Sequence, residues 1–181
     1  YAQLGARVIG VPRLSDGPDL ARLRALATEH RPKLLVTSSV LHNPTSTGIG
    51  SANAFQLLRL AHEFDFRVVE DDVYSDLHPG PAVSPCIRLA ALDQLQRVIY
   101  VGGFSKTLAA NLRVGFIACA PELAREFTDL KMLIGLTSPE LGERVVYRVL
   151  SEGHYRRHLH RLRERLARAR DPSLRAIEKL G

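Results

Sequence analysis

Six residues of this sequence have side chains whose chemistry and order along the chain could belong to one site. They are Asn43, Asp71, Tyr74, Ser105, Lys106 and Arg113. A lysine amine can form a Schiff base with an aldehyde, and a carboxylate can keep a pyridine nitrogen protonated, which makes the ring an electron sink. A tyrosine and an asparagine can hydrogen-bond a phenolate oxygen, and a serine and an arginine beside a glycine-rich turn suit a phosphate monoester. Together these groups match the functional groups of pyridoxal 5′-phosphate (PLP).

Each of these residues also has an ordinary structural interpretation when it is considered alone. Asn43 begins an Asn-Pro dipeptide, which is common in turns. Asp71 could cap a helix or face solvent, and Lys106 and Arg113 could be solvated surface charges. The case for a cofactor site therefore depends on the combination rather than on any one residue.

Four further residues of reactive types are not assigned to the site. Asp72 is expected to support its neighbours or to face solvent, and His42 is expected to have a structural role. The two cysteines, Cys86 and Cys119, are too few and too far apart for a zinc knuckle or a disulfide-rich scaffold. We expect no metal site.

Short β-rich runs alternate with helical stretches along the chain. The expected strands cover residues 6–11, 33–37, 66–70, 97–101 and 114–118, and the expected helices cover residues 19–30, 51–64, 122–133, 139–151 and 154 onward. The β runs are continuously apolar, which is typical of strands buried on both faces of a parallel sheet. The sequence therefore predicts an α/β fold with a doubly wound, mostly parallel sheet. In such sheets ligands bind beyond the carboxyl ends of the strands, and most of the candidate residues follow a strand directly.

Two local signals refine this prediction. Ser51 is expected to be the N-cap of the helix that begins there. Residues 76–85 are rich in proline and are expected to form a surface loop.

The composition is that of a globular domain. The chain has 181 residues, of which 45% are hydrophobic and 24% charged, which fits one domain and argues against a disordered chain. No apolar run is long enough to span a bilayer, so no membrane partner is expected. No signal peptide is visible, which favours a cytoplasmic location.

The net charge of +6 is concentrated near the C-terminal end. Residues 154–181 hold nine Arg or Lys and three acidic residues, so this segment carries the whole excess. Leu159, Leu162, Leu166 and Ala169 recur at three- and four-residue spacing, which predicts an amphipathic helix with its apolar face packed on the body of the protein. Contact with a nucleic acid is the alternative interpretation, although the interleaved aromatic residues of such surfaces are absent.

Three strings resemble those of fold-type I, class I/II PLP-dependent aminotransferases. They are NPT at 43–45, VEDDVY at 69–74 and YVGGFSKTLAANLRVG at 100–115. The likeness is greatest to the aminotransferase-like domain of MocR-type GntR regulators and to their stand-alone transaminase relatives. It covers essentially the whole chain, and the third string is the most specific.

The resemblance implies a role for each candidate. Lys106 would be the Schiff-base lysine and the base that moves the substrate proton, and Asp71 would partner the pyridine nitrogen. Tyr74 and Asn43 would bond the phenolate oxygen, and Ser105 and Arg113 would hold the phosphate.

The sequence departs from the family pattern at two of these places. Ser46 follows the NPT string where the family reads glycine, so the turn there is expected to differ. Gly103 stands where the family often has a serine or threonine that binds the phosphate.

The resemblance also implies that parts of the family fold lie outside this chain. The sequence begins at Tyr1 and stops within a helical pattern, so we expect a piece of a longer protein. Residues 1–152 would be a partial PLP-binding large-domain core with an incomplete sheet, and residues 153–181 an amphipathic helix leading toward a small domain. The full-length protein is expected to be a homodimer, and this piece is not expected to be active alone.

Several functions are compatible with such a domain. The first hypothesis is a PLP-dependent aminotransferase that exchanges an amino group between an amino acid and a 2-oxo acid. The alternative is a PLP-binding effector domain of a MocR/GntR-type transcriptional regulator, which would contact nucleic acid only through a winged helix upstream of Tyr1. A different PLP chemistry, such as β-elimination or decarboxylation, and a degenerate domain without cofactor are the remaining hypotheses.

Overall fold

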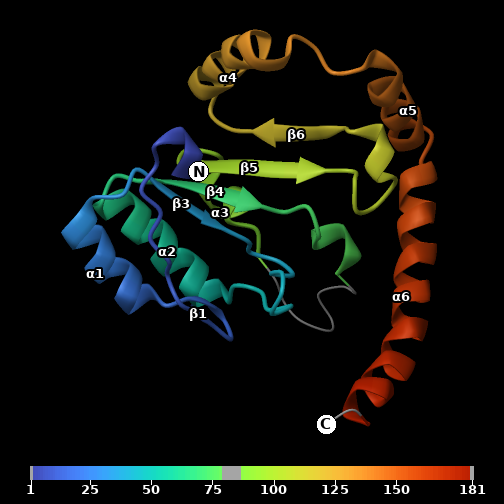
Figure 1. Cartoon of the computed structure of the whole chain (residues 1–181), viewed down its shortest axis with the longest axis horizontal. Helices are drawn as coiled ribbons and strands as arrows, with labels where there is room; N and C mark the ends of the chain where they lie inside the picture. Colours follow the sequence, from blue (N-terminus) through green and yellow to red (C-terminus); the bar gives the residue numbers. More distant parts are fainter. Residues whose placement is uncertain (1, 79–86, 180–181) are drawn as a thin grey trace. The chain divides into compact units, whose positions relative to one another are not determined.

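The computed structural model describes residues 2–78 and 87–179 (Figure 1). The chain forms two compact units. The first unit comprises Tyr1–Asp71 and Cys86–Ile99, and the second comprises Asp72–Pro85 and Tyr100–Gly181. The boundary between them therefore crosses strand β5.

A four-stranded sheet has the hydrogen-bonded order β3-β4-β5-β6. Its strands are β3 (Leu34–Thr37), β4 (Arg67–Asp71), β5 (Val98–Gly103) and β6 (Gly115–Ala118). Strands β3 and β4 are parallel, whereas β5 and β6 are antiparallel. Along β4 and β5 the bonds from Val68 N to Arg97 O and from Asp72 N to Val101 O advance in the same direction, as in a parallel pair. The predicted α/β class with a mostly parallel sheet is thus confirmed, with one antiparallel pair at the β6 edge.

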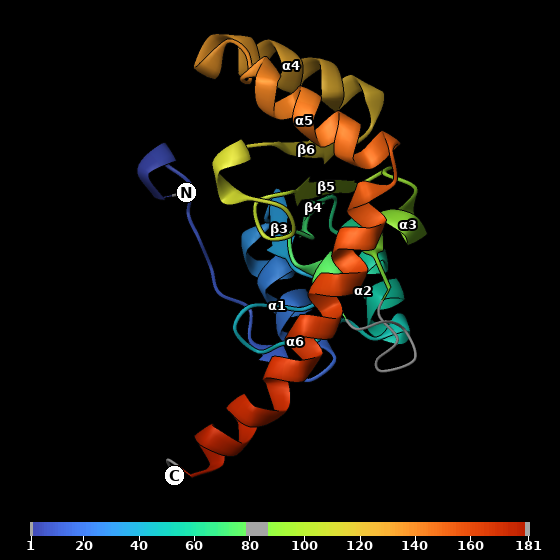
Figure 2. The same ribbon diagram turned by 90° about the vertical axis from the view of Figure 1, so that its right-hand side faces the viewer.

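In the first unit, helices α1 (Leu20–His30) and α2 (Ser51–Glu63) lie on the same side of β3 and β4 (Figures 1 and 2). Their apolar residues recur at helical spacing and form the core with residues of the strands and of the short helix α3 (Leu89–Asp93). The core residues are Leu23, Ala27, Ile49, Ala54, Leu57, Leu60, Ala61, Phe66, Val68, Leu89 and Val98. Asp19 caps α1 by accepting a hydrogen bond from Arg22 N at 2.9 Å.

Two expectations for this unit are wrong, and one element was not expected. Residues 6–11 form no strand; the side chains of Val8 and Ile9 are 65% and 37% exposed, and none of the described residues pairs with this segment. An apolar run becomes a strand only when its backbone groups find a neighbouring strand. Ser51 is the first residue of α2 rather than its cap, which is Gly50. The sequence did not predict α3.

A small hairpin and two short helical turns complete the connections. Strands β1 (Arg13–Leu14) and β2 (Gly17–Pro18) pair antiparallel, and the 3₁₀ turn η1 (Ala2–Leu4) precedes them. The predicted loop at 76–85 begins within the 3₁₀ turn η2 (Ser75–Leu77), and its residues 79–85 lie outside the described residues, as does Cys86.

In the second unit the helices are α4 (Pro121–Gly135), α5 (Glu140–Ser151) and α6 (His154–Glu178), and the turn η3 (Ala110–Leu112) precedes β6. All three helices lie where the sequence predicts them. In the described ranges 2–78 and 87–179, no helix is both long and apolar enough to cross a membrane.

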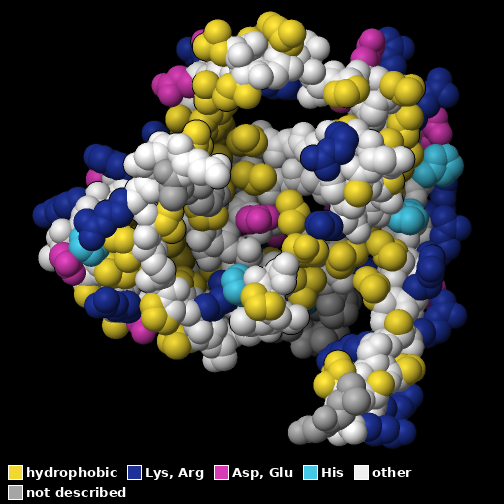
Figure 3. Space-filling view, in the orientation of Figure 1, with side chains coloured by type: hydrophobic (Ala, Val, Ile, Leu, Met, Phe, Trp, Pro, Cys, Tyr) yellow, Lys and Arg dark blue, Asp and Glu magenta, His cyan; other side chains and the backbone are white. Residues whose placement is uncertain are grey.

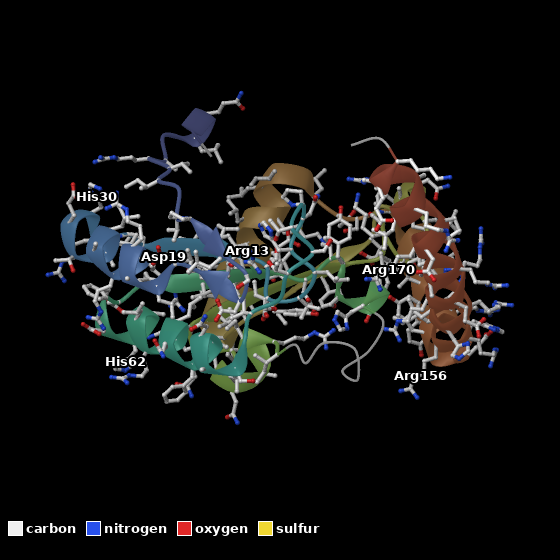
Figure 4. The ribbon with its side chains drawn as sticks, turned by 90° about the horizontal axis from the view of Figure 1, so that it is seen from below. Arg13, Asp19, His30, His62, Arg156 and Arg170 are labelled. Carbon is white, nitrogen blue, oxygen red and sulfur yellow. The ribbon has the colours of Figure 1, made fainter. Side chains whose placement is uncertain are left out.

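Helix α6 packs along only part of its predicted apolar face. Leu159 is buried, but Leu166 is 44% exposed and Ala169 is exposed as well. The expectation that the whole leucine face packs on the body is therefore wrong, because α6 contacts α5 and η2 near its start and extends past them. Arginines are exposed along α6, including Arg156 and Arg170 (Figures 3 and 4).

Candidate functional site

Lys106 and Tyr74 lie side by side in the second unit. The Lys106 amine is 5.7 Å from the centroid of the Tyr74 ring, which is within the range of a cation–π contact. Lys106 lies in a turn just after β5, and this turn is closed by a hydrogen bond of 2.8 Å from Leu108 N to Phe104 O. The Lys106 side chain is exposed, so its amine is accessible to a ligand.

Ser105, Lys106 and Arg113 belong to one hairpin loop. Gly103 of β5 pairs with Gly115 of β6, and Phe104 N donates to Val114 O at 3.1 Å. This pairing closes the base of the loop at 104–114, so that Ser105 and Arg113 lie next to its two ends. Arg113 is exposed and has a φ of 54°. The loop thus presents an amine, a hydroxyl and a guanidinium from one short stretch of backbone.

A small residue in β5 allows this hairpin to form. A Cβ atom on Gly102 would lie 2.5 Å from Cζ of Phe116 on the paired strand. The Phe116 ring also lies near Tyr100 and Phe104, with ring centroids 5.9 and 6.0 Å apart. The aromatic side chains pack over the glycine and support the start of the Lys106 turn.

Asp72 and Tyr100 anchor the segment that carries Tyr74. The Tyr100 hydroxyl and the Ser75 hydroxyl both donate hydrogen bonds to Asp72 Oδ2, the latter at 2.7 Å. Asp72 is 5% exposed. It therefore supports its neighbours, as one of the two expectations had it, and does not face solvent. Tyr74 itself leads into η2, where Leu77 N donates to Tyr74 O at 2.9 Å.

Asp71 and Asn43 belong to the first unit. Asp71 is the last residue of β4 and is exposed, whereas Glu70 before it is fully buried, as the alternation of side chains along a strand requires. Asn43 is exposed in the turn that follows β3, and its peptide bond to Pro44 is cis.

The turn that carries Asn43 is held by its neighbours. His42 N donates to Thr47 O at 2.9 Å, and Arg13 (Figure 4) donates through Nε to Thr47 Oγ1 at 3.0 Å. His42 Nδ1 lies 2.9 Å from Thr45 Oγ1, which gives His42 the structural role that we expected. Burial, and then the positive charge of Arg13, lower the pKa of His42.

Ser46 keeps the backbone conformation that a glycine would adopt. Its φ is 57°, in the left-handed region, and its amide donates to His42 O at 2.6 Å. The residue that stands in place of the family glycine thus has a left-handed conformation, the region that favours glycine.

The sequence did not identify a group of residues that contacts the Lys106 and Tyr74 segments from α6. Tyr155, His158 and Arg163 of this helix hydrogen-bond to Thr107 and Asp76. The periodicity predicted that one face of α6 is buried, but no local signal indicates which distant residues it meets.

The exposed groups fit PLP in chemistry. The second unit offers an accessible amine beside an aromatic ring, on Lys106 and Tyr74, and a cationic group on Arg113; the first unit offers a carboxylate at a strand end, on Asp71. These are the groups that an aldehyde, a pyridine nitrogen and a phosphate each require. The described residues contain no group of three or more His, Cys, Asp or Glu side chains that could hold a metal ion.

Comparisons with known proteins give consistent matches. The model of the family Aminotransferase class I and II matches residues 5–181. A 2-aminoadipate transaminase of Thermus thermophilus is 33% identical over 97% of this chain and 44% of its own length. YisV of Bacillus subtilis, an uncharacterized HTH-type transcriptional regulator, is 28% identical over 99% of this chain and 37% of its own length.

The chain also matches solved structures of aminotransferases. The crystal structure of LysN, an alpha-aminoadipate aminotransferase from Thermus thermophilus complexed with N-(5′-phosphopyridoxyl)-L-leucine, has a TM-score of 0.86 at 32% identity. The match covers 96% of this chain and 44% of that one. The chain thus spans less than half the length of the relatives it matches.

Proposed function

Because this chain belongs to the class I and II aminotransferase family, we propose that the protein that contains it is a PLP-dependent aminotransferase. The family match confirms the resemblance that the sequence strings indicate. The proposed reaction exchanges an amino group between an amino acid and a 2-oxo acid. The observation that carries the proposal is the exposed Lys106 amine beside the Tyr74 ring.

Each candidate residue has a task in this proposal. PLP, when bound, supplies an aldehyde that condenses with amines and a ring that withdraws electrons. Lys106 would hold the cofactor covalently, and once the substrate amine has displaced it, its free amine would move a proton between the substrate Cα and the cofactor carbon. Asp71 holds a proton on the ring nitrogen.

The remaining candidates orient the cofactor. Tyr74 and Asn43 donate hydrogen bonds to its phenolate oxygen, and Ser105 and Arg113 bind its phosphate. Gly103 has no side chain that could bind the phosphate, so backbone amides bind it together with Ser105 and Arg113. The phosphopyridoxyl ligand of the LysN structure supports PLP as the cofactor.

The context proposed for this reaction follows the family resemblance. Residues 1–152 are proposed to be part of the cofactor-binding large domain, and residues 153–181 to lead toward a small domain. The full-length protein is proposed to be a cytoplasmic homodimer.

The similarity to YisV over 99% of the chain favours one alternative, a PLP-binding effector domain of a transcriptional regulator. In this case the same residues bind PLP, but an amino acid would be sensed rather than turned over. DNA would be bound by a separate domain.

Spectroscopy of the full-length protein tests both proposals. The wild type, Lys106→Ala and the control Lys131→Ala, which changes an exposed lysine of α4, are mixed with PLP, and absorbance is recorded before and after borohydride. We expect a band that borohydride fixes covalently in the wild type and in the control but not in Lys106→Ala. Amino acids added one at a time then convert the band to the pyridoxamine form.

The outcomes separate the hypotheses. A wild type that takes up no PLP contradicts both proposals. Covalent PLP that no amino acid converts supports the regulator. Retention of the fixed band in Lys106→Ala would show that the Schiff-base residue is another lysine.

A further inference from the structure

The start of α6 contacts both segments that carry Tyr74 and Lys106. Tyr155 Oη donates a hydrogen bond to Asp76 Oδ2 at 2.6 Å and is hydrogen-bonded to Thr107 Oγ1 at 2.9 Å. A phenol has a single proton, so when Asp76 accepts it, the Thr107 hydroxyl donates to the Tyr155 oxygen. One side chain of α6 thus joins a residue two positions after Tyr74 to the residue next to Lys106.

Two more residues of α6 hold the backbone of the same segments. His158 Nε2 lies 2.8 Å from Thr107 O, and Arg163 Nε donates to Asp76 O at 2.7 Å. Since a carbonyl oxygen only accepts, His158 must carry its proton on Nε2. Thr107 and Asp76 are therefore each held at both the side chain and the backbone.

Packing makes this arrangement stiff. Thr107 is 2% exposed, and the Phe104 ring meets the Tyr155 ring edge-on with centroids 5.8 Å apart. Asp76 lies within η2, whose hydrogen bond from Leu77 N to Tyr74 O ties it to Tyr74. A displacement of either segment therefore breaks hydrogen bonds to α6.

The Tyr155 hydroxyl keeps its proton at neutral pH. Burial, and then the hydrogen bond to Asp76, raise the pKa of Tyr155 to about 12. The Asp76 carboxylate thus has a stable donor, and such charge-assisted hydrogen bonds are stronger than neutral ones.

We propose that Tyr155 is a positioning residue that, through Asp76 and Thr107, fixes the distance between the Tyr74 ring and the Lys106 amine. This inference rests on the proposed function in one respect: fixing the distance between the Tyr74 ring and the Lys106 amine is expected to tighten PLP binding. The hydrogen-bonded connection itself exists without a cofactor and can be tested without one.

The first experiment uses the full-length protein without PLP. Hydrogen exchange is followed in peptides that cover 73–78 and 104–108, in the wild type, in Tyr155→Phe and in Tyr147→Phe. Tyr147 is a suitable control because it is 70% exposed on α5. Loss of the hydroxyl should speed exchange in both peptides about tenfold in Tyr155→Phe, and not in Tyr147→Phe. Unchanged exchange in either peptide overturns the proposal, whether or not the protein binds PLP.

The second experiment measures PLP affinity and the pH midpoint of the bound cofactor's absorbance. We expect Tyr155→Phe to weaken PLP binding about tenfold and to shift the midpoint, because the Lys106 amine is no longer held near the Tyr74 ring. A lower melting temperature with the same affinity and midpoint indicates structural support alone and contradicts the proposal. A wild type that binds no PLP contradicts the proposed function. The hydrogen-exchange result, which needs no PLP, then still tests whether Tyr155 positions the two segments.

A double-mutant cycle gives the final check. Thr107→Val removes the hydroxyl that contacts Tyr155 and keeps the shape of the side chain. If the two hydroxyls act together, the exchange effect of Tyr155→Phe is smaller in the Thr107→Val background. Fully additive effects would overturn the connection.

Discussion

Gly142 of α5 lies directly against the carbonyl oxygen of Leu112, at a distance that no other residue type fits. A Cβ atom on Gly142 would lie 2.7 Å from Leu112 O and 3.3 Å from Cγ2 of Val114. Leu112 precedes Arg113, the proposed phosphate ligand. The close approach of α5 therefore helps to set the backbone position of Arg113.

Gly142→Ala is expected to destabilise the protein. The contact is with a backbone oxygen, so the helix or the loop must move, which costs about 1–3 kcal/mol and outweighs the gain in helix propensity of about 1 kcal/mol. PLP affinity should also fall, because Arg113 moves with Leu112. Urea denaturation and PLP titration measure the two effects. The control is Gly135→Ala, where a new Cβ has no atom within 4 Å; equal losses in both variants would contradict the explanation.

Glu70 stabilises α3 from inside the first unit. Its buried carboxylate accepts hydrogen bonds from Leu89 N and Ala90 N, both at 2.8 Å, and from the Ser39 hydroxyl. Glu70→Ala should lower the free energy of unfolding by about 2–4 kcal/mol, because buried donors lose their acceptor. Glu70→Gln should cost less, since one acceptor oxygen remains. Urea denaturation checks this, with Glu29→Gln as an exposed control; an alanine variant as stable as the control would refute it.

The ion pair of Arg24 and Glu63 connects α1 to α2. The guanidinium donates two hydrogen bonds to the carboxylate, at 2.5 and 2.7 Å. The hydrogen bond from Arg24 lowers the pKa of Glu63 below its ordinary value. The contribution of this ion pair to the free energy of unfolding is therefore present above the ordinary glutamate pKa. It is lost as the pH falls through the lowered pKa of Glu63 in the folded state.

Glu63→Gln should remove part of that acid sensitivity. Urea unfolding between neutral and acidic pH should show a smaller loss of stability in Glu63→Gln than in the wild type, and the difference should shrink at high salt because both side chains are exposed. Glu126→Gln, which changes an exposed glutamate of α4, should behave like the wild type. Identical pH profiles for the wild type and Glu63→Gln would exclude the pair as a source of stability.

Tyr155 gives a pH dependence of the opposite sign. Its pKa is raised to about 12, chiefly by burial. The contribution of Tyr155 to the free energy of unfolding is fully present below the ordinary tyrosine pKa. It is lost as the pH rises through the raised pKa of the folded state. The wild type should therefore lose more stability than Tyr155→Phe at strongly alkaline pH. Ultraviolet titration should show a late-ionising tyrosine in the wild type that is missing in Tyr155→Phe; the same late transitions in both proteins would contradict this.

Hydrophobic periodicity predicted most of the fold. Alternating apolar runs and helices located β3 to β6 and the long helices within a few residues, because burial of an apolar face is a local pattern in the sequence. The segment 6–11 shows where the pattern fails, since a strand also needs a partner. The same limit applies to Leu166 of α6, which has the right spacing but remains exposed.

The sequence by itself determined which residue types are available for cofactor chemistry and their order along the chain. Asn43, Asp71, Tyr74, Ser105, Lys106 and Arg113 can all be read from short strings, because each follows or precedes a strand. Only the tertiary structure decided what holds Lys106 and Tyr74 together. Tyr155 is separated from Asp76 by 79 positions and from Thr107 by 48, and hydrogen bonds over such separations depend on how α6 packs rather than on any local pattern of residues.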